Sequence, residues 1–265
     1  MVKNILLKIA YDGSGFHGWQ RQPGKRTVQG EVEKALSRTL GQQVNVDGTS
    51  RTDAGVHAFG QQATFQCDMN VPIGKLPMIL NNSFSNGKIC GERITGDLEI
   101  AEAVEVDLDF HARFNAVGKK YIYKIINNSA PDIFKRKFYY QISKALNTKD
   151  MGKAAKYMTG THDFKSFEAA GGNKRQTTVR TIYDLDVKSD NNDIQIEVTG
   201  DGFLYNMVRI ITGTLVEVGL GKRNAYSIPE ILAALDREAA GHTAPATGLY
   251  LSTVYYDKQT MNQEL

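Results

Sequence analysis

One short loop gathers the side chains of this chain that are best suited to acid–base or nucleophilic chemistry. Residues 48–60 read GTSRTDAGVHAFG and place Arg51, Asp53 and His57 among small neighbours. An aspartate held on a tight turn presents a carboxylate that can act as a nucleophile or a general base. The same pattern also fits an Asx-turn, in which Asp53 only caps backbone N–H groups. His57 fits a structural or phosphate-contacting role better than a catalytic one, and Arg51 also fits a solvent-facing position.

A second loop, residues 12–22, combines three glycines with aromatic and basic side chains in the sequence DGSGFHGWQRQ. It lacks the G-x-G-x-x-G spacing between a strand and a helix, so a dinucleotide site is rejected. Two interpretations stay open. Either the loop holds RNA through an aromatic ring and Arg21, or it is a wide turn that places Trp19 in the core.

Two further segments carry polar groups that a binding site would use. In residues 118–127, GKKYIYKIIN, strand alternation puts Tyr121 and Tyr123 on one face. Their phenols either face a cleft or are half-buried structural groups. In residues 203–213, FLYNMVRIITG, Arg209 lies among apolar residues. Because arginine is rarely buried alone, Arg209 is expected to pair with a carboxylate or to extend to the surface.

The charges are segregated along the chain. The 265 residues include 32 Lys and Arg against 29 Asp and Glu, a net charge of +3. Residues 92–109 and 184–201 are acidic, whereas residues 111–144 and 165–180 are basic and interleaved with aromatic side chains. Such blocks predict a basic face that fits binding of a phosphate backbone with base stacking. The alternative is that the charges only solvate the surface.

Composition excludes several classes of protein. With 41% hydrophobic and 23% charged residues, the chain is neither disordered, collagen-like nor a coiled-coil rod. No apolar run approaches the roughly 18 residues of a membrane-spanning helix. Residues 1–10, MVKNILLKIA, are expected to form a strand and not a signal peptide. Cys67 and Cys90 lack metal-ligand spacing, so we expect both to be buried and reduced in a cytoplasmic protein, with no metal site.

Regular elements must position these loops, and the residue patterns predict strands and helices in both halves of the chain. Strands are expected over residues 3–11, 43–47, 61–67, 88–95, 118–127, 181–187, 193–199 and 249–256. Helices are expected over residues 27–40, 76–82, 150–158, 205–218 and 227–240, with Thr27 and Ser227 as N-caps. The predicted class is α+β, with one half over residues 1–110 and another over residues 111–265. A cleft between two sheets is then the natural substrate site.

Five segments together resemble the tRNA pseudouridine synthase A family. They are LKIAYDGSGFHGWQRQ (7–22), SRTDAGVHA (50–58), FHARFNAVGKKYIYKI (110–125), GFLYNMVRIITGTLVEVG (202–219) and APATGLYL (244–251). The segments occur in the family's order over nearly the whole chain. One departure is Ser50, where many members have glycine; serine is small, so no loss of activity is expected.

The resemblance implies roles for the ambiguous residues. Asp53 matches the catalytic aspartate that acts in cleaving the glycosidic bond of uridine, although the order of its chemical steps stays open. Tyr121 matches the active-site tyrosine that contacts the flipped base. Arg209 matches the basic partner that keeps the aspartate ionised. The implied isomerisation detaches uracil and rejoins it through C5 without redox change, so neither a cofactor nor a metal is expected.

The implied substrates are uridines at positions 38, 39 and 40 of the tRNA anticodon stem-loop. The implied fold has two ferredoxin-like (RRM-like) halves, whose antiparallel sheets join around a central catalytic cleft. The implied assembly is a homodimer in which one tRNA touches both subunits. The candidate phosphate contacts are Arg21, Lys25, Arg26, Arg51, His57, Arg113, Lys119 and Lys120. Two alternatives stay open: a non-catalytic RNA-binding protein, and a nucleoside hydrolase that breaks the same bond with water.

Overall fold

The chain folds into two compact units, each built from mainly antiparallel strands with helices. The computed structural model describes residues 2–85, 88–89, 92–93, 96–172 and 176–264. Unit 1 comprises Met1–Ala116 and Leu251–Tyr256, and unit 2 comprises Val117–Tyr250 and Asp257–Leu265. The expected division of the chain near residue 110 stays a prediction.

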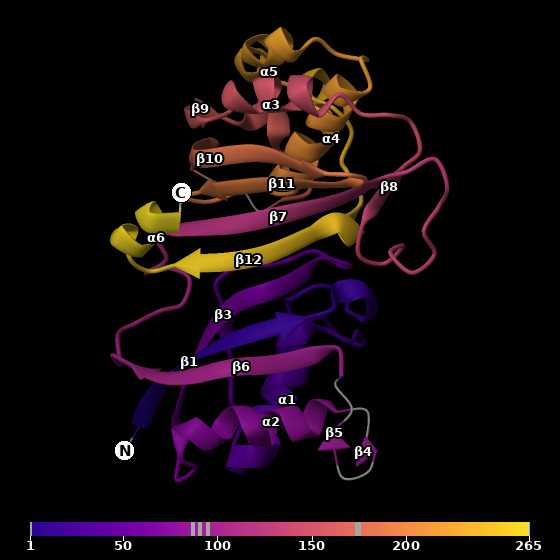
Figure 1. The fold of residues 1–265 in the computed structure, drawn as a ribbon. Coiled ribbons are helices and arrows are strands. Elements are labelled where there is room, and N and C mark those ends of the chain that lie inside the picture. The colour runs from indigo at the N-terminus through magenta and orange to yellow at the C-terminus, as the bar shows by residue number, and fades with distance from the viewer. Residues whose placement is uncertain (1, 86–87, 90–91, 94–95, 173–175, 265) are drawn as a thin grey trace. The chain divides into compact units, whose positions relative to one another are not determined.

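Unit 1 is a sheet with two helices. Its elements are β1 (Val2–Tyr11), α1 (Val28–Leu40), β2 (Asp47–Gly48), β3 (His57–Asp68), α2 (Leu76–Phe84), β4 (Lys88–Ile89), β5 (Glu92–Arg93) and β6 (Leu98–Val106). The strand order is β6-β1-β3, with β2 also paired to β3 and with β12 (Leu249–Tyr255) on the far side of β3. Strand β1 is antiparallel to both of its neighbours. Helix α2 packs against β6 and α1 (Figure 1).

Helix α1 begins and ends where the sequence predicts. The Thr27 side chain accepts a hydrogen bond from the Gly30 N–H at the N-terminus, and Gly41 ends the helix with a φ of 68°. Val28, Val32 and Leu36 are fully buried on one face. This spacing gives the helix one apolar stripe, which anchors the loops at both of its ends.

Unit 2 holds most of the strands and helices that follow residue 117. Its elements are β7 (Gly118–Asn127), β8 (Tyr140–Ile142), α3 (Thr148–Lys156), β9 (Gly160–Asp163), β10 (Val179–Asp190), β11 (Asp193–Gly200), α4 (Met207–Gly219), α5 (Ile228–Ala234) and α6 (Lys258–Glu264). The antiparallel order is β7-β11-β10-β9, and β8 runs parallel to β7. Helix α3 packs against α4 and β10 (Figure 1). Helix α4 is almost entirely buried, because nearly all of its residues are apolar or small.

The predicted α+β class with antiparallel sheets is confirmed. The strand expected over residues 118–127 is β7, and the strands expected over residues 181–187 and 193–199 are β10 and β11, which pair antiparallel. Cys67 is buried, as expected. The expected cleft between two sheets stays a prediction.

The strand expected over residues 43–47 is wrong, since only Asp47–Gly48 pairs with β3. Side chains of α1 take the backbone bonds that a sheet ladder would have used. The Val44 N–H donates to Ser37 Oγ at 3.0 Å, and the Val46 N–H donates to Glu33 Oε1 at 3.1 Å. The segment is therefore tied to the helix and not to a strand.

The helix expected over residues 227–240 is much shorter. Helix α5 ends at Ala234 because Leu235 turns into the left-handed region, with a φ of 51°. Ser227 is not the predicted side-chain cap: its hydroxyl donates to the Asn224 carbonyl instead. Strands β6, β8 and β9 and helix α6 were not predicted at all.

The strand expected over residues 88–95 is a short antiparallel pair of β4 and β5 in the part that the structure describes. Residues 90, 91, 94 and 95, and with them the expectation for Cys90, lie outside the described residues. Within the described ranges, no helix is long and apolar enough to cross a membrane.

Candidate active site

Asp53 lies on a turn directly before β3. Its carbonyl accepts the Val56 N–H at 3.1 Å, and Gly55 takes a φ of 80° to close the turn. The preceding residue is fixed, because the buried Thr52 hydroxyl lies 2.7 Å from the Tyr11 hydroxyl. The Asp53 side chain is half-buried. The chain therefore holds this carboxylate on a closed turn whose neighbour is anchored in the core.

The glycine-rich loop packs directly against this turn, and Trp19 is in the core as one of the two interpretations predicted. The backbone N–H of Trp19 donates to the Thr52 carbonyl at 3.0 Å. A Cβ at Gly13 would lie 2.0 Å from the Val56 carbonyl oxygen, and one at Gly18 would lie 2.7 Å from the Thr52 carbonyl oxygen. Glycine is required at both places because the two loops touch backbone to backbone.

Two buried polar side chains of β3 bond to the loops around Asp53: His57 to the glycine-rich loop, and Gln61 to Ser50 before the turn. His57 is 2% exposed, and its Nδ1 accepts the Gly13 N–H at 3.1 Å. Gln61 is 0% exposed; its Nε2 donates to the Ser50 carbonyl at 2.6 Å, and its Oε1 accepts the Ser50 N–H at 3.2 Å. Among the described residues the buried Ser50 hydroxyl has no hydrogen-bond partner. These bonds support a loop-bracing role for His57.

The segment that follows β6 is tied to the base of the same loop. The hydroxyls of Thr49 and Tyr256 both donate to the Ala112 carbonyl, each at 2.9 Å. Burial raises the pKa of Tyr256 to about 12, so its phenol stays protonated near neutral pH and donates. The Asp53 loop is thus bonded to three other parts of unit 1: the glycine-rich loop, strand β3 and the segment that follows β6.

Tyr121 and Tyr123 lie on β7 in unit 2 and have different surroundings. Tyr121 is half-buried and meets Phe203 edge-to-face, with ring centroids 5.2 Å apart. Tyr123 is fully buried, and its hydroxyl donates to the Pro245 carbonyl at 2.6 Å. Burial raises the pKa of Tyr123 far above its ordinary value. Tyr123 is therefore the structural tyrosine of the pair, and Tyr121 is the more accessible one.

Arg209 is the third residue of α4 and is half-buried. Its Nε donates to the Ala244 carbonyl at 2.8 Å, and its Nη1 donates to Asn206 Oδ1 at 2.8 Å. The Ala244 N–H in turn donates to the Arg209 carbonyl at 3.1 Å. The guanidinium is therefore held in one orientation at the first turn of α4. Asp53 belongs to the other unit, and the expected pairing of the two stays a prediction.

The candidate phosphate contacts differ in their surroundings. Three of them form ion pairs inside their own unit: Arg21 with Glu33, Arg26 with Asp97, and Lys120 with Glu197. Lys25, Arg51 and Arg113 are exposed, and Lys119 is half-buried. The Arg21 and Arg26 side chains are 59% and 44% exposed, and exposed ion pairs contribute only about 0–1 kcal/mol, so these two cations can turn to a phosphate. The Lys120–Glu197 pair is more buried, with side chains 19% and 12% exposed. Contact of these residues with RNA stays a prediction.

Sequence reasoning missed the groups that hold the candidate catalytic side chains. Gln61 had a detectable signal, since a polar residue inside an apolar strand needs a buried partner. The carbonyls of Ala244 and Pro245 had none, because a backbone acceptor leaves no trace in residue type. They became visible only with the hydrogen bonds from Arg209 and Tyr123.

The comparisons with known proteins cover nearly the whole chain. A family model described as tRNA pseudouridine synthase matches residues 8–115 and 154–257. The tRNA pseudouridine synthase A of Bacillus subtilis is 47% identical over 255 residues, which are 96% of this chain and 99% of that protein. The proteins of the same name from Ruminiclostridium cellulolyticum and Acetivibrio thermocellus are 47% and 44% identical, over 96% of this chain and 100% of each.

A solved structure of an H/ACA RNP bound to a substrate RNA containing 2'-deoxyuridine covers 80% of this chain and 53% of that chain. Its TM-score is 0.32 and its sequence identity 9%. The curated relatives, in contrast, are 44–47% identical over 96% of this chain. They define the class of the protein as an RNA-modifying enzyme, a pseudouridine synthase. Within that class, the chain belongs to the tRNA pseudouridine synthase family.

Proposed function

We propose that this tRNA pseudouridine synthase acts on uridines at positions 38, 39 and 40 of the anticodon stem-loop, with Asp53 as the catalytic carboxylate. The observation that carries the assignment is the brace around the Asp53 turn. Gly13, Thr52 and Gln61 fix that turn from three directions. A catalytic group must be held in its productive geometry, and such a support provides it.

The reaction balances without any added reactant. The C1'–N1 bond of uridine breaks, the base turns, and a C1'–C5 bond forms to the same sugar. The hydrogen on C5 leaves as a proton and N1 gains one, so no electrons are exchanged. Asp53 acts in the cleavage step as a nucleophile or base. Because the uridine must leave its stack at a cost of a few kcal/mol, contacts to the RNA backbone have to offset that cost.

Tyr121 and Arg209 complete the proposed catalytic set. Tyr121 contacts the flipped base with a half-buried ring that rests on Phe203. Arg209 pairs with the Asp53 carboxylate and keeps it ionised. Its orientation by Ala244 and Asn206 supports this role, because a preoriented guanidinium loses little freedom on pairing.

The test replaces the carboxylate without changing its shape. Asp53→Asn is expected to lose pseudouridine formation and to keep tRNA binding, because only the reacting group is altered. The assay follows tritium release from tRNA labelled at uridine C5, with modified positions mapped on the product. Asp47→Asn is the matched control, since Asp47 is an exposed carboxylate of the same loop region. Normal turnover by Asp53→Asn would show that another group carries the chemistry.

The same assay separates the two alternatives. A non-catalytic RNA-binding protein would give no tritium release with the wild-type chain. A nucleoside hydrolase would release free uracil in step with turnover, whereas the isomerase releases none. The RNA-binding part of the proposal predicts affinity for tRNA that falls as salt rises, because Lys and Arg displace counterions from phosphates. The proposed homodimer predicts twice the chain's mass of 29.3 kDa in light scattering.

A further inference from the structure

The segment from Ala239 to Pro245 lies directly on one face of α4. Arg209, Gly213 and Glu217 are spaced four residues apart and so share that face. Arg209 bonds to Ala244 at one end of the contact, and Glu217 bonds to His242 at the other. Between them, a Cβ at Gly213 would lie 1.7 Å from the His242 carbonyl oxygen. The two backbones therefore touch, and the segment cannot shift on the helix without breaking these contacts.

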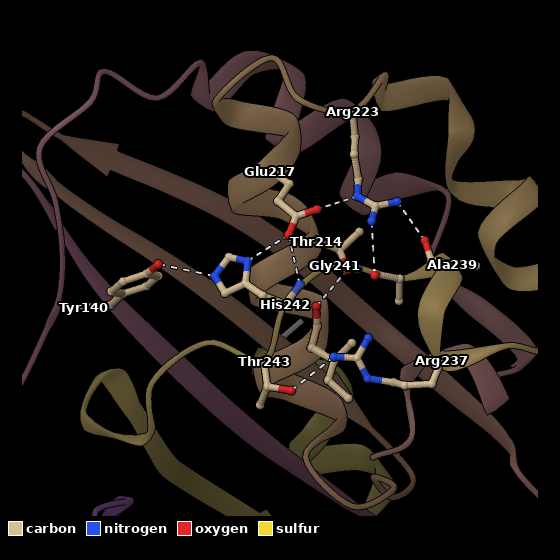
Figure 2. Close-up of polar contacts among 11 residues, drawn as sticks. Tyr140, Thr214, Glu217, Arg223, Arg237, Ala239, Gly241, His242 and Thr243 are labelled. Carbon is tan, nitrogen blue, oxygen red and sulfur yellow. Dashed lines mark hydrogen bonds and ion pairs between the residues drawn. The ribbon is translucent and has the colours of Figure 1, made fainter. Parts of the chain in front are cut away.

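Glu217 is the centre of a polar cluster at the far end of this contact (Figure 2). Its Oε1 accepts both the backbone N–H and the ring Nδ1–H of His242, each at 2.9 Å. Its Oε2 accepts Arg223 Nε at 2.5 Å. The same Arg223 guanidinium also donates to the carbonyls of Ala239 and Ala240, at 2.7 and 3.1 Å. Glu217 thus ties the start of the segment to the helix both directly and through Arg223.

Two neighbouring contacts extend the cluster along the segment. Thr214, next to Gly213 on the helix, accepts the Gly241 N–H at 2.9 Å. The His242 Nε2 lies 3.3 Å from the Tyr140 hydroxyl, and Figure 2 shows the two side chains facing each other. The residues from Ala239 to His242 are therefore bonded at every position, and Ala244 is fully buried just beyond them.

The charge of Glu217 is maintained by these partners. Burial raises the pKa of this carboxyl, but the hydrogen bonds from Arg223 and His242 outweigh burial and lower the pKa to about 2. The carboxylate lies in the last turn of α4, where the helix dipole disfavours a negative charge. The helix alone therefore does not favour an acidic residue at position 217. The bonds from Arg223 and His242 do favour one, because they need a charged acceptor.

We propose that Glu217 is a positioning residue, which fixes the Arg209 guanidinium by seating the 239–245 segment on α4. The inference rests on the proposed function of Arg209 and adds the group that sets its geometry. The Ala244 carbonyl orients Arg209 Nε, and the next carbonyl, of Pro245, accepts the Tyr123 hydroxyl on the strand that carries Tyr121. One seated segment therefore orients groups on both α4 and β7.

The test uses Glu217→Gln, which keeps an oxygen for the His242 N–H and removes the charge. Loosening of the segment is expected to lower the single-turnover rate on tRNA by about 10-fold or more, since small misplacements of a catalytic group cost rates of this order. The Kd for tRNA is expected to stay within about twofold, because Glu217 is not one of the proposed RNA contacts. The second variant, His242→Ala, removes one contact of Glu217 and is expected to act in the same direction with a smaller effect.

A direct readout does not depend on activity. The Nε–H of Arg209 gives a side-chain NMR signal, which is assigned by its loss in Arg209→Lys. Its bond to the Ala244 carbonyl protects it, so hydrogen exchange of this signal is expected to accelerate in Glu217→Gln. The matched control is Asn147→Ala, which removes the side-chain N-cap of α3 in the same unit and so lowers stability, while the backbone bond from Asn147 to Gly219 at the end of α4 is kept. Exchange at Arg209 and turnover are expected to be unchanged in this control.

The outcomes are distinguishable from failure of the proposed function. Unchanged Nε–H exchange in Glu217→Gln would overturn the positioning role, and so would an unchanged single-turnover rate. An equal loss of rate in Asn147→Ala would also overturn it, because general destabilisation would then explain the result. An inactive wild-type chain would refute the proposed function, while the exchange measurement would still decide whether Glu217 positions Arg209.

Discussion

Substituting Gly13 tests whether the glycine-rich loop sets the place of the Asp53 turn. In Gly13→Ala the new Cβ would lie 2.0 Å from the carbonyl oxygen of Val56 and 2.5 Å from its carbonyl carbon. Both are backbone atoms, so no side-chain rotation relieves the clash. One of the two loops has to move, and Val56 is the residue whose N–H closes the turn on Asp53.

The expected loss of stability combines two effects. Overpacking by one methyl group costs about 1–3 kcal/mol. A shift of Gly13 also weakens its N–H bond to His57, worth about 1 kcal/mol. The sum of about 2–4 kcal/mol corresponds to a fall in melting temperature of roughly 4–16 °C, at the ~2–4 °C per kcal/mol of a chain of this size.

Activity is expected to fall more steeply than stability. Displacing the Asp53 turn by the order of 1 Å lowers turnover by about 10²-fold at temperatures where the variant is still folded. Tritium release at C5 measures turnover, and circular dichroism measures folding. Gly74→Ala is the matched control, because Gly74 is exposed in the same unit and a Cβ there meets nothing within 4 Å. If Gly13→Ala melted and turned over like Gly74→Ala, the loop contact would not position Asp53.

Two further predictions concern buried polar groups. Glu217 has a folded-state pKa of about 2 against an ordinary 4.5, so its stabilisation is complete above pH 4.5 and is lost as pH falls towards 2. Each pKa unit corresponds to about 1.36 kcal/mol, so the charged Glu217 contributes at most about 3 kcal/mol to the free energy of unfolding. Solvent screening lowers this contribution, because the side chain is 17% exposed. The difference in melting temperature between wild type and Glu217→Gln should therefore shrink between pH 5 and pH 3; a constant difference would contradict this. Gln61→Leu leaves the Ser50 N–H and carbonyl unpaired and should cost about 1–3 kcal/mol for each group in denaturant unfolding, whereas a neutral effect would show that water replaces the amide.

The sequence predicted well those helices and strands whose limits are set by residues within or next to the element. Strand β7 and helix α1 match their predictions closely, because alternation and end-capping residues lie within the elements themselves. Helix α5 ends early for a tertiary reason: after Leu235 turns, the Asp236 N–H donates to the Ser166 hydroxyl, 70 residues away in sequence. The residue pattern that predicted a helix as far as residue 240 carried no sign of that bond.

Charge obscured another element. Strand β6 lies in the acidic block of residues 92–109 and was not predicted, because charged residues are depleted in strands. It is the edge strand of its sheet, paired only with β1 among the described strands. Acidic side chains on an edge strand discourage pairing with other chains. The acidic residues 92–109, which were interpreted as surface charge, therefore also keep the exposed edge of β6 from pairing with other chains.

The candidate site shows the same limit at the level of single atoms. Residue types singled out Asp53, Tyr121 and Arg209 as candidates with more than one interpretation, and the resemblance to the pseudouridine synthase family implied their roles. The acceptor that orients Arg209 is a backbone carbonyl, and any residue at position 244 would supply it. The sequence does show glycines where the segment of residues 239–245 contacts α4. A Cβ at Gly213 or Gly241 would collide with the other backbone, so these glycines, and not Ala244 itself, are the sequence trace of how the arginine is held.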